Sequence, residues 1–134
     1  MQLHLDVTLG WPDAPWIAVL ACYLLWIGYL ALTNLERARS VGALTKAARV
    51  GAAPLLLIFG PLDVLVNWTV GTLLFLEFPR EFTLSKRCTR HYNDAGFRGR
   101  VSRWLGRNAL DPYDHRGAHV NPAVLSAYKE RNHG

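Results

Sequence analysis

Two long apolar stretches occupy the first 78 residues of the chain, and a polar, basic stretch follows them. Residues 16–35, WIAVLACYLLWIGYLALTNL, run for 20 positions without a charged side chain. As a helix they would extend about 30 Å, the thickness of the hydrocarbon core of a bilayer. We therefore predict a transmembrane helix over 16–35, preceded by an N-terminal extramembrane segment over 1–15.

The second apolar stretch covers residues 50–78 and is expected to be broken near 60–61. Pro54, Gly60 and Pro61 disfavour a continuous helix, because proline removes a backbone donor and glycine adds flexibility. The stretch is predicted to be either a kinked spanning helix or a re-entrant segment that turns at Gly60 and Pro61. The predicted fold class is an all-α integral membrane protein with two hydrophobic helical segments, most simply a helical hairpin.

The charges favour a membrane location without fixing the topology. Lys and Arg number 15 against 10 Asp and Glu, for a net charge of +5. Four of these cations lie in the connector at 36–49, and the other eleven lie in the tail at 79–134. An ordinary second span would place the two groups on opposite sides of the membrane, whereas a re-entrant segment keeps all 15 on one side. Both arrangements stay open, in a bacterial inner membrane.

Polar and small residues interrupt the second apolar stretch at helical spacing. Gly60, Asp63, Asn67 and Gly71 would share one face of a helix. We favour a helix-packing face against the first segment or a second copy of the chain, because small residues allow close approach and Asn bonds across such contacts. Two alternatives are a pore or proton path lined by Asp63, and an Asp63 cap on a helix that restarts after Pro61.

The tail is predicted to be helical, basic and amphipathic. Thr83 is expected to cap a helix over 83–94, and Asn121 to begin one over 121–132. Between them, residues 97–110 alternate apolar and cationic side chains at helical spacing, as in helices that lie on a membrane surface. Anionic lipid head groups or a partner protein are favoured as the ligand, and the alternatives are ordinary packing on the rest of the chain and, less favoured, nucleic acid. The predicted binding side chains are Arg98, Arg100, Arg103, Trp104 and Arg107.

Cysteine and histidine in the tail have spacings that zinc sites use. The four candidates are Cys88, His91, His115 and His119. Arginines flank them closely, and the residues read more simply as solvated tail residues, so we predict no metal and no cofactor. The chain also lacks a nucleophile elbow, a glycine-rich phosphate loop and an HExxH motif. A non-enzymatic protein is therefore expected.

The segment LDVLVNWTVGTLLFLEFPREFTLSKR, with a later aspartate-rich turn and His119, resembles small uncharacterised membrane proteins encoded by tailed phages and prophages. The shared pattern is D-x-L-x-N with a following glycine, then T-L-S-x-R, over about residues 62–119. The usual terminal His-Cys ending is absent, since Val120 follows His119. The resemblance implies phage origin and a host inner-membrane location, and it implies no activity.

The predicted function is that of a small inner-membrane accessory protein that docks its basic tail on anionic lipid or a partner protein. A homo-oligomer or a complex with another membrane protein would use the Asp63 and Asn67 face. One alternative is a holin-like membrane permeabiliser with Asp63 lining the lesion. A second is a membrane-anchored nucleic-acid-binding protein, which the basic tail would allow.

Overall fold

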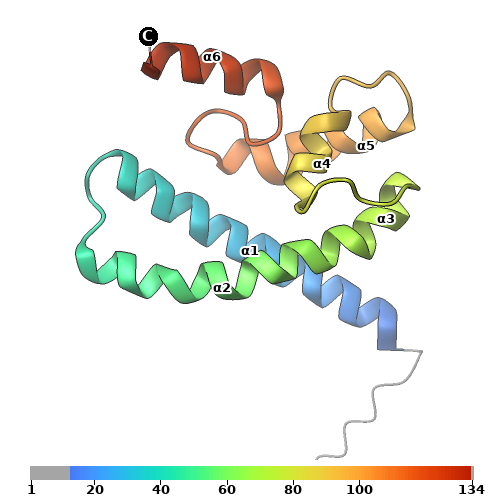
Figure 1. Ribbon diagram of the computed structural model, residues 1–134, viewed down its shortest axis with the longest axis horizontal. Helices are drawn as coiled ribbons and strands as arrows, with labels where there is room; N and C mark the ends of the chain where they lie inside the picture. The colour runs from blue at the N-terminus through green and yellow to red at the C-terminus, as the bar shows by residue number, and fades with distance from the viewer. Residues whose placement is uncertain (1–12, 134) are drawn as a thin grey trace, which may run out of the picture.

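The computed structural model describes residues 13–133, and every regular element in that range is helical (Figure 1). This confirms the predicted all-α class. Residues 1–12, most of the predicted N-terminal segment, lie outside the described range. The elements are α1 (Ala14–Ser40), α2 (Lys46–Trp68), α3 (Val70–Phe75), α4 (Leu84–His91), α5 (Phe97–Leu105), the π-helical turn η2 (Gly106–Leu110), the 3-10 turn η3 (Asp111–Tyr113) and α6 (Pro122–His133).

Helices α1 and α2 form an antiparallel hairpin (Figure 1). Helix α1 continues to Ser40, so most of the predicted connector is helical and only residues 41–45 form a loop. Gly42 has a φ of 72°, which suits glycine, and the Thr45 side chain accepts a bond from the Ala48 amide to begin α2. Two helical stretches are long and apolar enough to cross a membrane, Ala14–Ser40 and Lys46–Phe75.

The second apolar helix is not broken where the sequence suggested. Helix α2 continues through Pro54 and Pro61, and the irregularity lies at Thr69, between α2 and α3. There the Thr69 amide and hydroxyl both donate to the Leu65 carbonyl, at 3.0 and 2.8 Å. A proline removes one helical hydrogen bond but leaves the remaining turns intact, as in many membrane helices.

The hairpin is held closely together where Gly28 of α1 meets Phe59 of α2. Gly28 is the buried residue of α1. A Cβ atom added there would lie 2.3 Å from the Phe59 ring. Because that distance is far below van der Waals contact, the glycine is required for the helices to approach this closely.

Helices α3, α4 and α5 pack together with the turns η2 and η3 against one flank of the hairpin, and α6 projects beyond this group (Figure 1). We call residues 84–120 the C-terminal unit. Its buried core contains Cys88, Tyr92 and Val120 and includes Phe75 of α3. Hydrogen bonds from α1 fix the unit to the hairpin: the Trp26 indole donates to the Ala109 carbonyl at 3.1 Å and the Tyr29 hydroxyl to the Leu110 carbonyl at 2.5 Å. The polar tail therefore lies beside the middle of α1 and not beyond its end.

Candidate functional site

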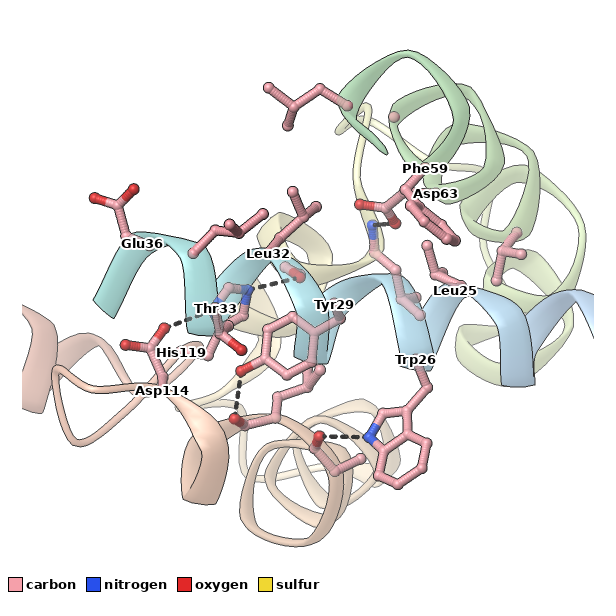
Figure 2. Close-up of a pocket in the computed structure, with 18 of the residues that line it drawn as sticks. Leu25, Trp26, Tyr29, Leu32, Thr33, Glu36, Phe59, Asp63, Asp114 and His119 are labelled. Carbon is pink, nitrogen blue, oxygen red and sulfur yellow. Dashed lines mark hydrogen bonds and ion pairs between the residues drawn. The ribbon is translucent and has the colours of Figure 1, made fainter. Parts of the chain in front are cut away.

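A cavity of about 880 Å³ lies between the hairpin and the C-terminal unit. Its walls on the hairpin side are mainly apolar and include Leu25, Leu32 and Phe59 (Figure 2). Ionisable side chains such as Asp114 and His119 reach it from the C-terminal unit (Figure 2). An apolar pocket with a few converging polar groups has the composition typical of a ligand-binding site.

Ser85, His119 and Asp114 form a hydrogen-bonded chain at the wall of this cavity. The Nε2 atom of His119 lies 3.1 Å from Ser85 Oγ, and its Nδ1 atom lies 2.8 Å from Asp114 Oδ2 (Figure 2). An ionised carboxylate can only accept, so Nδ1–H donates to Asp114, and in the neutral imidazole Nε2 then accepts from the Ser85 hydroxyl. All three residues line the cavity.

Neighbouring groups fix both ends of the Asp114–His119 pair. Burial alone would raise the pKa of Asp114, but hydrogen bonds from the Arg116 side chain and backbone, with the one from His119, hold it well below its usual range. Asp111 accepts from the backbone amides of His119 and Val120 at 2.7 and 2.9 Å. The carboxylate of Asp114 is thus kept charged, and the backbone that carries the imidazole is anchored.

The ring of Tyr29 and the first turn of α4 complete the surroundings of His119 and Ser85. Tyr29 meets the imidazole edge to face, with ring centroids 4.7 Å apart. Ser85 lies in the first turn of α4, after the Thr83 cap, whose side chain accepts from the Lys86 amide at 3.3 Å. The Ser85 hydroxyl therefore lies at the positive end of the α4 helix dipole.

The polar face of α2 contacts α4 instead of α1. Asp63 Oδ1 accepts from the Leu84 amide at 3.0 Å, and the Asn67 side chain donates to the Glu81 carbonyl at 2.6 Å. Gly71 is buried, and an added Cβ would lie 3.2 Å from Arg87, whereas one at Gly60 would meet nothing within 4 Å. The alternative that Asp63 caps a helix restarting after Pro61 is wrong, because α2 continues through Pro61. Asp63 instead accepts from the amide of the first residue of α4.

Substitution of Asp63 separates a capping role from a role that needs its charge. Asp63→Asn keeps an oxygen acceptor for the Leu84 amide, so we expect its melting temperature to stay close to that of the wild type. Asp63→Leu leaves that amide without its partner and is expected to lose about 1–3 kcal/mol of stability. Thermal unfolding in detergent, followed by circular dichroism, measures both. Equal losses in the two variants would contradict the capping role.

A second polar cluster surrounds Glu77, just beyond the second apolar helix. His91 Nε2 lies 2.7 Å from Glu77 Oε1, Arg98 lies 3.3 Å from Oε2, and Arg90 also pairs with this carboxylate. On its other side, His91 Nδ1 lies 2.6 Å from Asp94. Burial alone would raise the pKa of Glu77, but the bonds from His91 and Arg90 lower it to about 2. The cluster ties α4 and α5 to the end of α3.

The four candidate metal ligands occupy different surroundings. Cys88 is fully buried, and burial raises the pKa of its thiol to about 12, so it is protonated at neutral pH. His91 belongs to the Glu77 cluster, His119 faces Ser85, and His115 packs edge to face on Tyr128. Among residues 13–133, no three His, Cys, Asp or Glu side chains are arranged to hold a metal ion.

The predicted lipid-binding residues lie on α5 and η2 and form two groups, one bonded within the protein and one exposed. Arg98 donates to the Phe75 carbonyl at 2.8 Å, and Arg103 donates to the Tyr92 carbonyl at 2.7 Å. These two cations serve internal contacts. The exposed members are Arg100, Trp104 and Arg107.

Sequence reasoning missed the Ser85–His119–Asp114 arrangement. Asp114 belongs to the aspartate-rich turn of the phage-like pattern, in which Ser85 also occurs, and the only chemical role considered for His119 was that of a metal ligand. The members are up to 34 positions apart, and no local motif joins them. No protein-family model, curated protein or solved structure matches the chain.

Proposed function

We propose that the protein is a small membrane accessory protein whose hairpin contacts lipid on one face and carries the C-terminal unit on the other. The observation that supports this most is the exposed apolar surface of the hairpin, where Trp16 is 74% and Leu57 is 76% exposed. Other large exposed apolar side chains of the hairpin include Ile17, Val19, Leu20, Tyr23, Leu24, Ile27, Leu56, Ile58, Leu65 and Trp68. An apolar surface of this extent is unfavourable in water and favourable in a bilayer.

Part of this exposed apolar surface faces away from the C-terminal unit, whereas Tyr23 shares the face of Trp26, with ring centroids 6.4 Å apart. On α1, Leu24 lies two positions before Trp26, which bonds to the unit, and two positions correspond to about 200° of rotation. On α2, Leu65 lies two positions after Asp63, which bonds to α4. The hairpin would then lie tilted or flat, with lipid on one side and the charged unit in water on the other. An upright hairpin would instead bury those charges in hydrocarbon, which is costly.

Helix α5 supplies a second contact with lipid. Phe97 and Trp104 are exposed on it, and a shallow depression joins them to Leu74 of α3. Arg100 and Arg107 lie beside these apolar side chains. Aromatic rings inserted at the acyl boundary with cations on phosphate are the usual features of an interfacial helix.

The proposed location is a bacterial inner membrane, or the host membrane if the chain is phage encoded. An anionic leaflet there would attract the cations that flank the hairpin loop and those of the C-terminal unit. A holin-like pore has less support, because the Asp63 carboxylate already accepts a hydrogen bond from the Leu84 amide.

Labelling of single cysteines in intact cells tests the orientation. Ala43→Cys lies in the hairpin loop and Ser126→Cys on the exposed surface of α6. Cys22 and Cys88 are replaced by serine and alanine. A tilted or flat hairpin keeps the loop and the tail on one side, so we expect both positions to react with a membrane-impermeant maleimide from the same side. Labelling from opposite sides would refute this orientation and restore the ordinary two-span topology.

A further inference from the structure

We propose that Ser85, His119 and Asp114 form a nucleophilic serine centre that hydrolyses carboxylic esters of long-chain amphiphiles. This departs from the non-enzymatic expectation drawn from the sequence. The serine centre stands on the geometry alone, whereas the lipid-like class of substrate rests on the proposed membrane function.

The three side chains have the connectivity that activates a serine. A hydroxyl becomes a nucleophile when a base accepts its proton, and an imidazole is such a base when a carboxylate holds its other nitrogen. Here the Ser85–His119 and His119–Asp114 contacts are 3.1 and 2.8 Å. Both lie within the hydrogen-bonding range that this chemistry requires.

Other contacts keep the centre in this arrangement. Arg116 donates to both carboxylate oxygens of Asp114, at 2.9 and 2.6 Å, which keeps the carboxylate charged. Asp111 holds the backbone at His119, and Asp63 holds the Leu84 amide next to Ser85. Ser85 is partly buried and lines the cavity, so its hydroxyl lies next to the space that a substrate would occupy.

The proposed reaction has two balanced halves. In the first, Ser85 Oγ attacks the ester carbonyl carbon while its proton passes to His119 Nε2. The bond from that carbon to the leaving alcohol oxygen breaks, and His119 transfers the proton to that alcohol oxygen. In the second, water attacks the acyl-serine, gives its proton to His119 and releases a carboxylic acid, and the proton returns to Ser85. Negative charge that develops on the carbonyl oxygen lies near the positive end of α4.

The cavity indicates the class of substrate. Its volume of about 880 Å³ falls within the range of small-molecule sites. Leu25, Leu32, Leu56 and Phe59 of the hairpin provide apolar walls that suit an acyl chain. The hairpin also contributes the charged side chains of Glu36, Arg39 and Arg49, which suit the polar head of an amphiphile. The same hairpin carries the proposed lipid-facing surface, so an amphiphile would have a short route from the bilayer to Ser85.

The test uses the full-length protein in detergent micelles with a fluorophosphonate probe, which phosphonylates activated serines. We expect a mass increase on Ser85 located by peptide mass spectrometry, none in Ser85→Ala, and labelling slowed by roughly 10³-fold in His119→Gln. Ser126→Ala is the matched control, because Ser126 lies on the exposed surface of α6, and it should be labelled like the wild type. An unlabelled Ser85 in folded wild-type protein would overturn the centre.

Ester hydrolysis then tests the substrate class. p-Nitrophenyl laurate is expected to be hydrolysed at least about tenfold faster than p-nitrophenyl acetate, since burial of each methylene contributes about 0.8 kcal/mol. Hydrolysis by Ser85→Ala at the wild-type rate would refute the centre. Equal rates for the two esters, with Ser85 labelled, would refute the lipid-like class alone. Fluorophosphonate labelling and ester hydrolysis need no bilayer. Failure of the serine centre can therefore be distinguished from failure of the membrane orientation, which the cysteine labelling tests.

Discussion

Gly99→Ala is expected to destabilise the C-terminal unit by about 3 kcal/mol or more. A Cβ atom at Gly99 would lie 1.8 Å from the Asp94 carbonyl oxygen and 2.7 Å from its carbon, so the backbone itself has to move. The Arg103 guanidinium also donates to that carbonyl, at 2.9 Å, and would lose its place. Thermal unfolding in detergent, followed by circular dichroism, measures the loss.

Gly96→Ala is the matched control in the same turn. An added Cβ at Gly96 meets nothing within 4 Å. Because Gly96 precedes α5 as its N-cap, we expect a loss of no more than about 1 kcal/mol from the poorer cap. If Gly99→Ala and Gly96→Ala unfold at the same temperature, then α5 does not pack closely on the turn before it.

Glu77→Gln is expected to cost about 2–3 kcal/mol, because it leaves His91, Arg90 and Arg98 around a neutral amide. The Glu77 side chain is only 15% exposed, so solvent screens these interactions weakly. Glu81→Gln is the matched control, since Glu81 pairs with Arg90 alone among these three side chains. Its expected loss is about 1 kcal/mol or less.

The stability difference between wild type and Glu77→Gln depends on pH with a defined sign. The pKa of Glu77 falls from 4.5 to about 2 on folding, so the folded chain binds fewer protons than the unfolded chain between these values. The stability contributed by Glu77 is complete above about pH 4.5 and is lost as the pH falls toward about 2. The difference in free energy of unfolding between wild type and Glu77→Gln should shrink over that window. A difference that stays constant would contradict the assigned cluster.

The proposed serine centre and the proposed membrane orientation give the hairpin two distinct tasks. One face of α1 and α2 contacts lipid, and the other face forms the walls of the cavity beside Ser85. Tyr29 connects the two halves of the molecule, since its hydroxyl bonds to the Leu110 carbonyl and its ring contacts His119. Movement of the C-terminal unit relative to the hairpin would therefore change the surroundings of the imidazole.

Local sequence determined the helices and several of their boundaries. Uninterrupted apolar runs predicted the two long helices, because removing apolar side chains from water is favourable whatever surrounds them, and the runs are long enough to span a bilayer as helices. Thr83 and Asn121 were predicted as helix starts, and both precede helices in the structure, α4 and α6. Capping depends on a side chain and the amides two or three residues later, so the sequence contains all the information it needs.

Tertiary contacts decided the path of the second helix and the role of its polar face. A break at Pro61 was expected from a rule about single residues, yet α2 continues through it. The pairing of Asp63 and Asn67 with α4 and the loop before it joins residues 14 and 21 positions apart. Helical periodicity showed that these side chains share a face, but it could not show which element would cover that face.

The Ser85–His119–Asp114 arrangement belongs wholly to the tertiary structure. Its members come from the first turn of α4 and from the turns after η3, and they meet only because the C-terminal unit folds around Cys88 and Val120. The sequence by itself determined an all-helical chain with two apolar helices and a basic tail, because periodicity and capping act over a few residues. Only the packed structure decided which polar side chains face each other, because hydrogen bonds depend on distances that long-range folding sets.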